Sequence, residues 1–147
     1  MMTINTRIFG EVEVDENKLI YFPEGIIGFP DMKRFLLIHD SEKEKKGVIR
    51  WLQSVDENEF ALPIISPLEV VEEYNPLIED ELLKNIGYTE EAELLVLSTI
   101  TVPSDIKKMS VNLMAPIIIN VNNRFACQII LDGDYPIKHY IYDKLNN

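Results

Sequence analysis

The sequence predicts a mainly β fold, a single antiparallel β-barrel-like domain that carries one or two short helices. Three observations support this fold class. Short runs rich in aromatic and branched residues recur along the chain, turn-forming residues separate them, and helical signals are confined to the middle. A chain of 147 residues can bury roughly two thirds of its unfolded surface, so we expect one domain, residues 1–147.

Five strand-like runs occupy the first part of the chain. In the first run, Ile8, Val12 and Val14 alternate with polar neighbours, which is typical of a strand with one buried face. Turn formers such as Asp, Asn, Pro and Gly stand between the runs. Their regular spacing favours a meandering antiparallel sheet. The five runs are 7–14, 18–22, 34–39, 49–55 and 59–65.

Helical signals begin after these runs. Ser66 is a candidate N-cap, Pro67 suits the first helical position, and Glu69 follows three residues after the cap. Asn75 and Pro76 then interrupt the pattern. The sequence therefore predicts a short helix or a single helical turn at this point.

A second helix is predicted within 78–88. Glu79, Asp80 and Glu81 suit the positive N-terminal end of a helix, and the leucines and isoleucine that follow form an apolar face. Gly87 can close the helix in the left-handed conformation. Both predicted helices are short.

Three more strands are predicted after the helices. Residues 93–102 form a continuous apolar run, which implies burial on both faces or a place in a closed barrel. Residues 109–121 and 125–131 follow, and the polar run NVNNRF between them predicts a hairpin turn in which asparagine adopts a positive φ. Pro116 lacks an amide hydrogen, so we expect it at an edge or a bulge.

The acidic residues are concentrated in one stretch. Asp and Glu number 25 against 14 Lys and Arg, which gives a net charge of −11. Residues 56–93 hold twelve of these acids and only Lys84 as a base. This charge argues against direct binding to nucleic acid or an anionic membrane and favours a basic protein partner. The stretch is either a solvated surface or a docking surface for a cationic protein, and charge alone does not separate the two.

No catalytic or metal-binding constellation stands out. His39 and His139 are far apart, with no Cys or His at ligand spacing, and the glycine-containing run PEGIIGFP lacks the lysine and helix of a phosphate-binding loop. Cys127 is the only cysteine, which excludes an intramolecular disulfide, and it is interpreted as a small buried hydrophobe. Without a signal segment or a long apolar run, we expect a cytoplasmic protein. Without a catalytic or ligand-binding constellation, we expect no enzymatic activity, cofactor, metal or small-molecule substrate.

Several stretches, taken in order, resemble the family of the bacterial flagellar assembly factor FliW. The resemblance covers residues 6–135, nearly the full length, and the shared order and spacing of the stretches make the match specific. The stretches are RIFGEVEV, IYFPEGIIGF, IRWLQSV, YNPLI, LSTITVP, VNLMAPIIIN and CQIIL.

Individual positions match the motifs of this family. They belong to four features of the family pattern: a glycine-turn motif, a central strand, a signature near the C-terminal end, and a single tyrosine associated with the proline-bearing segment. Ile27 stands where a proline is common, and Ser66 where an aspartate is common. Ala126 and Cys127 replace a more usual glycine-containing approach to Gln128. The matching positions are Gly25, Gly28, Phe29, Trp51, Leu52, Gln53, Tyr74, Asn112, Leu113, Pro116 and Asn120.

The resemblance implies a function without catalysis. Members of the family are small cytoplasmic proteins with a compact, mostly antiparallel β-barrel-like domain. They bind flagellin before its export, and they also bind CsrA, an RNA-binding translational regulator. In this scheme, free flagellin occupies the assembly factor, CsrA is released, and CsrA represses flagellin translation. Flagellin and CsrA are therefore the expected partners.

The resemblance suggests a binding partner for the acidic stretch. An RNA-binding protein presents cationic groups for phosphates, and an acidic surface raises the rate of encounter with such a protein and orients it. Our hypothesis is that acids from the predicted helices face CsrA, with Tyr74 as a further partner-binding candidate. The acids are Glu69, Glu72, Glu73, Asp80 and Glu81.

Flagellin requires a different surface. Its terminal segments are amphipathic and poorly ordered before assembly, which favours an apolar groove that binds a helix or adds a strand. Asn112 and Asn120 could bond the backbone of such a peptide; alternatively, they satisfy buried backbone groups at a bulge near Pro116. Two other functions stay open: a small β-barrel enzyme or ligand carrier with a pocket built from distant residues, and an interaction module for a different basic partner.

Overall fold

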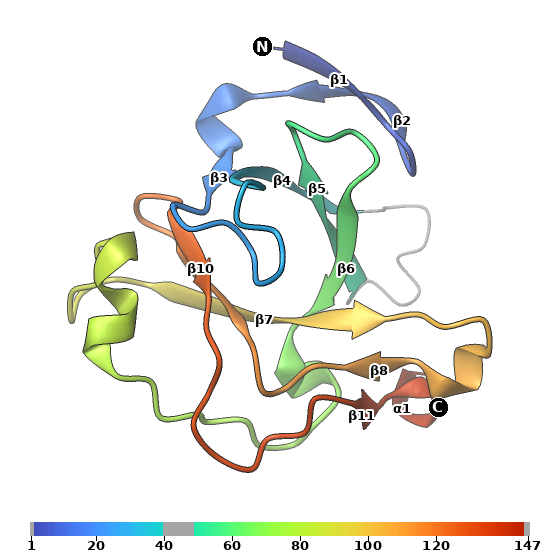
Figure 1. Cartoon of the computed structure of the whole chain (residues 1–147), viewed down its shortest axis with the longest axis vertical. Coiled ribbons are helices and arrows are strands. Elements are labelled where there is room, and N and C mark those ends of the chain that lie inside the picture. The colour runs from blue at the N-terminus through green and yellow to red at the C-terminus, as the bar shows by residue number, and fades with distance from the viewer. Residues whose placement is uncertain (1, 40–48, 146–147) are drawn as a thin grey trace.

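The computed structural model describes residues 2–39 and 49–145 and confirms a mainly β, antiparallel, barrel-like fold (Figure 1). No helix in these residues is long and apolar enough to cross a membrane. The strands are β1 (Met2–Thr6), β2 (Gly10–Val14), β3 (Ile20–Tyr21), β4 (Arg34–His39), β5 (Ile49–Ser54), β6 (Ala61–Ile65), β7 (Leu94–Thr101), β8 (Ser110–Val111), β9 (Ile117–Asn120), β10 (Ala126–Gln128) and β11 (His139–Tyr140). The short helical segments are η1 (Glu16–Lys18), η3 (Pro67–Glu69), η4 (Asp80–Ile86), η5 (Ile106–Lys108) and α1 (Tyr142–Leu145).

Most of the strands form one curled sheet in the order β10-β9-β7-β6-β5-β4-β3, with β8 beside the end of β7 and β11 beside β8. Every ladder in this sheet is antiparallel. The two end strands meet where Tyr21 forms a parallel bridge with Phe125, and the Tyr21 N–H donates to the Arg124 carbonyl at 3.0 Å. We term this contact the seam. Because one bridge joins the ends, the sheet is barrel-like without a continuous closing ladder in the described residues.

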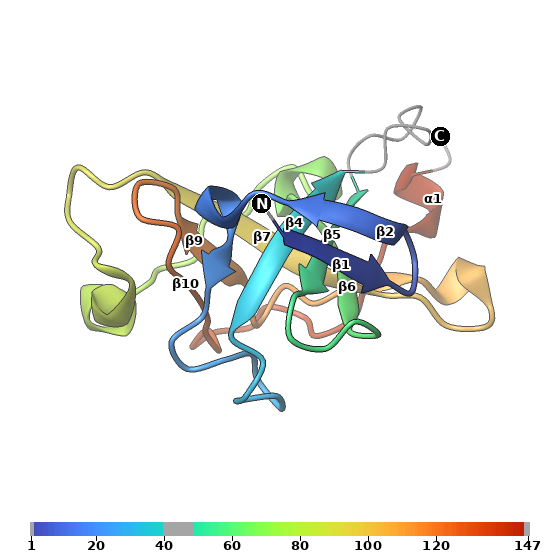
Figure 2. The ribbon, with the colours of Figure 1, turned by 90° about the horizontal axis from the view of Figure 1, so that it is seen from above.

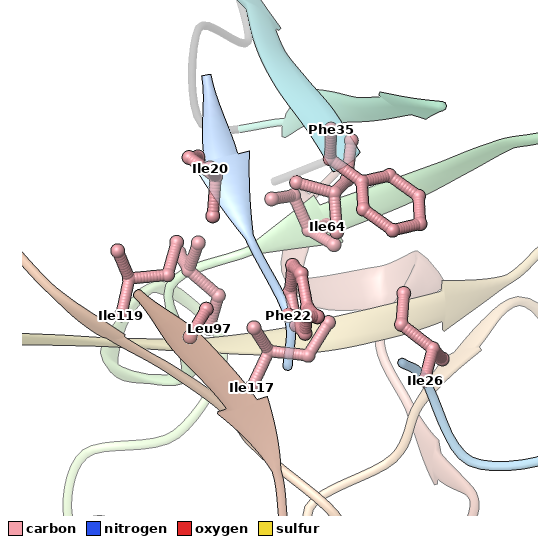
Figure 3. Packing of buried hydrophobic residues seen from close by; sticks show 10 residues of the cluster. Ile20, Phe22, Ile26, Phe35, Ile64, Leu97, Ile117 and Ile119 are labelled. Atoms are coloured by element: carbon pink, nitrogen blue, oxygen red, sulfur yellow. The ribbon is translucent and has the colours of Figure 1, made fainter. Parts of the chain in front are cut away.

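Apolar side chains fill the interior of the curled sheet (Figure 3). Phe22 and Phe35 are fully buried there and meet edge to face, with ring centroids 5.2 Å apart. Successive residues of a strand face opposite sides, so each strand supplies alternate residues to this interior. The buried members are Ile20, Phe22, Ile26, Phe35, Leu52, Ile64, Leu97, Ile117, Ile119 and Ala126. The inside of the barrel is therefore a packed core.

Two elements cover the outer face of the sheet. The β1–β2 hairpin crosses above β4 and β5 (Figure 2), and its Val14 packs with Leu36 of β4. On the other side of the barrel, η4 buries Ile86 in an outer cluster that includes Val96 of β7. Since β7 also sends Leu97 into the interior, its continuous apolar run is covered on both faces, as the sequence predicts.

The strand predicted over 7–14 is present only from Gly10 to Val14, as β2, and residues 7–9 form a turn instead. The chain forms a hairpin there, because β1 precedes a turn and pairs with β2 in antiparallel register. Thr6 closes the turn: its hydroxyl accepts from the Phe9 N–H and donates to the Gly10 carbonyl, both at 2.9 Å. Ile8 lies within the turn, so an apolar alternation that includes it does not mark one strand.

Residues 109–121, expected as one strand, form two. Strands β8 and β9 both pair with β7, and a bend over 112–116 separates them. Pro116 lies in this bend and outside the ladder, as its missing amide hydrogen predicts. The strand expected over 125–131 is also shorter, because regular pairing in β10 ends at Gln128.

The predicted hairpin turn between β9 and β10 is present, but its positive φ of 66° falls on Arg124 and not on an asparagine. Asn123 closes the turn with its side chain, whose Oδ1 accepts from the Phe125 N–H at 2.9 Å. The Arg124 guanidinium donates to the carbonyls of Lys18 at 2.9 Å and Leu19 at 3.3 Å. These bonds offset the cost of a left-handed residue with a side chain, roughly 1–2 kcal/mol.

Both predicted helices are present as short 3-10 helices, η3 and η4. Gly87 follows η4 with a φ of 69°, which confirms the predicted left-handed closure. Ser66 occupies the N-cap position of η3 but makes no capping hydrogen bond with its side chain. The start of η3 therefore depends on Pro67, whose ring fixes φ near the helical value.

Candidate partner-binding surfaces

The acidic segment, residues 66–93, runs along the outside of the barrel between β6 and β7 (Figure 1). It passes through η3, an extended stretch and η4. The five candidate acids are all exposed and fall into two groups, one at η3 and one in the first turn of η4. The first group is Glu69, Glu72 and Glu73, and the second is Asp80 and Glu81.

The carboxylates of the acidic segment have no ion-pair partner within residues 2–39 and 49–145. The one ion pair in those residues joins Arg34 to Asp56, outside the segment, with Arg34 Nε 3.0 Å from Asp56 Oδ1. A hollow beside η4 is lined by three acidic residues and one basic residue, which are Asp80, Glu81, Glu90 and Lys84. Unneutralised charges on one side of a protein produce a field that extends into solvent and attracts cationic partners.

Tyr74 attaches the acidic segment to the barrel. Its hydroxyl donates to the Leu113 carbonyl at 2.6 Å, and its ring meets Tyr135 edge to face at 5.2 Å. Burial, with a smaller contribution from Tyr135, raises the pKa of Tyr74 to about 12, so the phenol stays protonated at neutral pH. Tyr74 therefore positions the segment, and its direct contact with a partner stays a prediction.

Asn120 holds the end of η4. Its Nδ2 donates to the carbonyls of Ile86 at 2.8 Å and Gly87 at 3.4 Å, while its Oδ1 accepts from the Asn122 N–H at 3.0 Å. Asn120 is only 2% exposed. It thus satisfies carbonyls that a helix end leaves without intrahelical partners. These bonds support a structural role for Asn120, and its contact with a partner peptide stays a prediction.

Asn112 folds the bend over 112–116. Its Oδ1 accepts from the N–H groups of Met114 at 2.9 Å and Ala115 at 3.1 Å, so one side chain turns two consecutive amides inward. Asn112 is partly exposed and also lines a surface hollow. Its position is therefore compatible with a structural role and with a partner contact.

Two hollows at β10 share Ile27 and Gln128 in their linings, and we term the two together the β10 groove. The first has a volume of about 300 Å³ and is lined by Glu24 and Cys127. The second, of about 290 Å³, is more apolar. Gln128 joins the two walls, since its Oε1 accepts from the Ile27 N–H at 3.0 Å and its Nε2 donates to the Ala115 carbonyl at 3.1 Å.

Large apolar side chains are exposed at the second hollow. Ile27 is 46% exposed, and Ile130 and Ile137 are 62% and 61% exposed. Together with the partly exposed Met114, they line one short groove. Apolar side chains gathered in this way are typical of a site that another chain covers.

The glycine loop, residues 22–33, forms one wall of the β10 groove. At its tip Ile26 and Phe29 pair through their backbones: the Ile26 N–H donates to Phe29 at 3.1 Å, and the Phe29 N–H donates to Ile26 at 2.7 Å. Gly25 has a φ of 71°, and a Cβ there would lie 2.4 Å from the Pro30 carbonyl oxygen. A glycine is therefore required for the loop to close against β10.

Trp51 and Gln53, which belong to the central strand of the resemblance, make structural contacts in β5. Trp51 meets the ring of Phe9 edge to face, with centroids 6.2 Å apart, and so attaches the β1–β2 turn. Gln53 is fully buried, and its Nε2 donates to the Asn58 carbonyl at 3.0 Å. This bond holds the turn between β5 and β6.

Two observations in the described residues concern possible metal ligands and the one cysteine. They contain no group of three or more His, Cys, Asp or Glu side chains that could hold a metal ion. Burial, and secondarily Glu24, raises the pKa of Cys127 to about 11, so its thiol stays protonated at neutral pH and is a weak nucleophile. What the described side chains offer is two surfaces of different chemistry, one acidic and one apolar.

The chain is similar over nearly its whole length to one family of known proteins. The family model described as FliW protein matches residues 3–141. The chain belongs to the FliW family. The flagellar assembly factor FliW of Lachnoclostridium phytofermentans is 48% identical over 147 residues, which cover 99% of this chain and 94% of that protein. That of Lachnospira eligens is 45% identical over 146 residues, which cover 98% and 97%.

A solved structure agrees with this assignment. The crystal structure of a flagellar assembly factor FliW superposes with a TM-score of 0.86 at 30% identity and covers 96% of this chain and 97% of that chain. The resemblance drawn from sequence motifs is therefore confirmed. The relatives are named for flagellar assembly and not for a reaction.

In this FliW fold, segments far apart in sequence meet at the β10 groove. Sequence reasoning singled out the glycine loop and Asn112 but missed that Gln128 joins them. It also missed Ile130 and Ile137, which contribute the exposed apolar surface. Ile137 offered a weak signal, because it is an isolated large apolar residue within a polar stretch.

Proposed function

We propose that this FliW-family chain is a non-catalytic flagellar assembly factor that works in the cytoplasm, binds flagellin and antagonises CsrA by binding it. The names of the relatives support the general role. The observation that carries the proposal is the presence of two chemically different surfaces on one barrel. They are the acidic segment, without an ion pair in the described residues, and the apolar β10 groove.

CsrA is the partner that we propose for the acidic segment. An RNA-binding protein carries cationic groups for phosphates, and exposed carboxylates attract such groups over distances of about a Debye length, roughly 8–10 Å at physiological salt. The hydrogen bond from Tyr74 to Leu113 fixes the segment to the barrel. The carboxylates are therefore presented from a defined backbone, which favours one orientation of the bound partner.

Flagellin is the partner that we propose for the β10 groove. Segments of a protein that are poorly ordered before assembly need a partner that covers their apolar side chains. Ile27, Ile130 and Ile137 offer apolar surface of the matching kind. Asn112, at the rim of the same hollow, is the polar residue that we propose for contact with the bound segment.

The bend over 112–116 touches both surfaces. The Leu113 carbonyl accepts from Tyr74 of the acidic segment, while Met114 and Ala115 line the groove. A segment bound in the groove would press on the same bend that supports the acidic segment. We propose that this contact lets flagellin release CsrA, which then represses flagellin translation, so that synthesis follows export.

A displacement titration tests this function. The purified chain is loaded with CsrA from the same cell, flagellin is added in steps, and the CsrA that stays bound is measured. We expect flagellin to displace CsrA. A stable complex that holds both partners at once would contradict the switch, and a chain that binds neither partner would contradict the proposed function as a whole.

A basic protein of matched net charge that does not bind RNA serves as the control for CsrA. Equal affinity for this control would indicate a general module for basic partners. The other alternative, a small β-barrel enzyme or ligand carrier, gains no support from a specific observation. Core side chains fill the interior of the barrel, and the hollows at the β10 groove lie at the surface.

A further inference from the structure

The backbone next to the β10 groove has an edge that faces away from the sheet. In an antiparallel ladder, residues alternate between those whose N–H and C=O face the partner strand and those whose groups face away. The N–H groups of Ile129 and Leu131 donate back toward the chain that precedes β9, at 3.2 and 2.7 Å. Gln128 and Ile130 lie at the alternate positions, so their N–H and C=O groups face away.

The backbone of this edge is paired at one end only. At the seam, the bridge between Tyr21 and Phe125 covers the start of β10. Beyond the seam, the backbone N–H groups of Gln128 and Ile130 have no hydrogen-bond partner among the residues that the structure describes. The β10 groove lies beside them. A strand edge of this kind is a template for pairing with another chain.

Gln128 lines both hollows of the groove, whereas Cys127 lines only the hollow that contains Glu24 and Ile130 lines only the apolar one. Side chains alternate across a strand, so Gln128 and Ile130 share one face, and both line the apolar hollow with Ile27. Cys127 belongs to the other face and lines the hollow that contains Glu24. A strand laid along the edge would therefore present alternate residues to an apolar surface and the residues between them to a carboxylate.

We propose that the β10 groove binds an extended peptide segment that adds as a strand to the edge at Gln128 and Ile130. The segment carries apolar residues at alternate positions and a Lys or Arg on its other face, opposite Glu24. The inference rests on the proposed function for the identity of the partner, because it assigns this segment to a terminal region of flagellin. It deepens that function by specifying the mode of binding.

The unpaired backbone groups favour a strand over a helix. A helix bonds its own backbone internally, so a helix in the groove would remove water from the N–H and C=O groups of Gln128 and Ile130 without replacing the lost hydrogen bonds. An added strand pairs these groups at the usual spacing of every second residue. A bound helix would therefore leave the N–H and C=O groups of Gln128 and Ile130 without hydrogen bonds, whereas a bound strand would supply them.

Ile130→Pro tests the added strand. Proline removes the N–H that faces away from β9, so no bond of the existing ladder is lost, and proline is tolerated at strand edges. Ile130→Ala is the matched control, because it removes the same apolar side chain and keeps the N–H. Affinity for purified flagellin is measured by calorimetric titration. We expect Ile130→Pro to bind about two- to tenfold more weakly than Ile130→Ala, as the loss of one net hydrogen bond predicts.

The outcomes separate the two proposals. Equal affinities of two folded variants would overturn the added strand and leave flagellin as the partner. If the unaltered chain does not bind flagellin, the proposed function and this inference fail together. Should Ile130→Pro not fold, amide hydrogen exchange of the unaltered chain decides the question. Slower exchange at Gln128 and Ile130 with flagellin bound supports the strand, and unchanged exchange at both overturns it.

The cation opposite Glu24 has a separate test. Glu24→Gln removes the charge but keeps an oxygen that can accept from Asn85 Nδ2, which lies 3.0 Å from Glu24 Oε1. We expect Glu24→Gln to bind flagellin about two- to fivefold more weakly at low salt, with a smaller dependence on salt. Unchanged affinity at low salt would overturn the Lys or Arg of the segment.

Discussion

At Gly25 the backbone leaves no room for a side chain. Its φ is 71°, and a Cβ would lie 2.4 Å from the Pro30 carbonyl oxygen. Gly28 lies at the tip of the same loop with a φ of 85°, but no atom lies within 4 Å of its Cβ position. Both positions therefore require a left-handed backbone conformation, but only Gly25 also lacks the space for a side chain.

We predict that Gly25→Ala destabilises the protein more than Gly28→Ala. Both variants place a side chain in a left-handed conformation, which costs about 1–3 kcal/mol. Only Gly25→Ala adds a clash with the backbone of Pro30. Urea unfolding of both variants measures the difference in the free energy of unfolding. Equal losses would show that the loop shifts freely at Pro30.

A positive φ could be predicted from the sequence where the residue type and its local position favour that conformation. Gly87 is such a case, because a glycine after an apolar helix face is a common helix end. Arg124 is the opposite case. Its hydrogen bonds reach Leu19 and Lys18, 105 and 106 residues earlier in the chain, and no local pattern reveals contacts of that range.

Among the elements, the bend over 112–116 is the one on which both proposed surfaces depend. It carries the Leu113 carbonyl that accepts from Tyr74, and it supplies part of the wall of the β10 groove. The side chain of Asn112 holds the bend by two hydrogen bonds. A change at this side chain should therefore act on stability and on binding in distinguishable ways.

We predict that Asn112→Ala lowers the free energy of unfolding by about 1–3 kcal/mol, because two amides lose their acceptor. Thermal and urea unfolding measure this loss, and flagellin affinity is measured on the same sample. Asn5→Ala, at an exposed position of β1, is the control. Loss of flagellin binding with unchanged stability would assign Asn112 to the binding site and contradict a purely structural role.

Elements were predictable where apolar period and turn residues agree. The apolar run over 93–102 and the helix closed by Gly87 are such cases, and both are confirmed. The β1–β2 hairpin was not predictable from alternation, because Thr6 closes a turn inside an apparently regular pattern. The bend over 112–116 was hidden because apolar residues continue through it.

The two candidate surfaces also differ in how far they could be predicted from the sequence. Charge is a property of composition, so the acidic segment could be named from the sequence before its backbone path was known. The β10 groove is assembled from Ile27, Met114, Ile130 and Ile137, which share no local pattern. Only the curling of the sheet brings the glycine loop beside β10, and the sequence predicts strands without their order in space.

At the scale of the whole molecule, negative charge is distributed unevenly. The chain has a net charge of −11, and the stretch over 56–93 carries essentially all of it. In the described residues, these carboxylates are exposed, three of them in the turn between β5 and β6 and nine on the acidic segment, and apart from Asp56 they form no ion pair. A partner that recognises this charge should respond to its position and not only to its total.

We predict that the double variant Glu72→Lys with Glu73→Lys weakens CsrA binding on the order of tenfold at low salt and reduces its dependence on salt. Glu11→Lys with Glu13→Lys is the matched control, because both residues are exposed on β2 and the net charge changes equally. Affinities are measured at two salt concentrations. Equal effects of the two double variants would show that only the total charge matters.

The seam has a consequence for how the chain reaches its native state. The Tyr21 amide bonds to Arg124, and about a hundred residues must be in place before the two can meet. Contacts of such long range form slowly, because the intervening chain loses its freedom before the contact is made. We therefore expect the meander of β4, β5 and β6 to form early and the seam to form last, including during synthesis on the ribosome. Pulsed hydrogen exchange during refolding would show late protection of the Tyr21 amide; early protection would contradict this order.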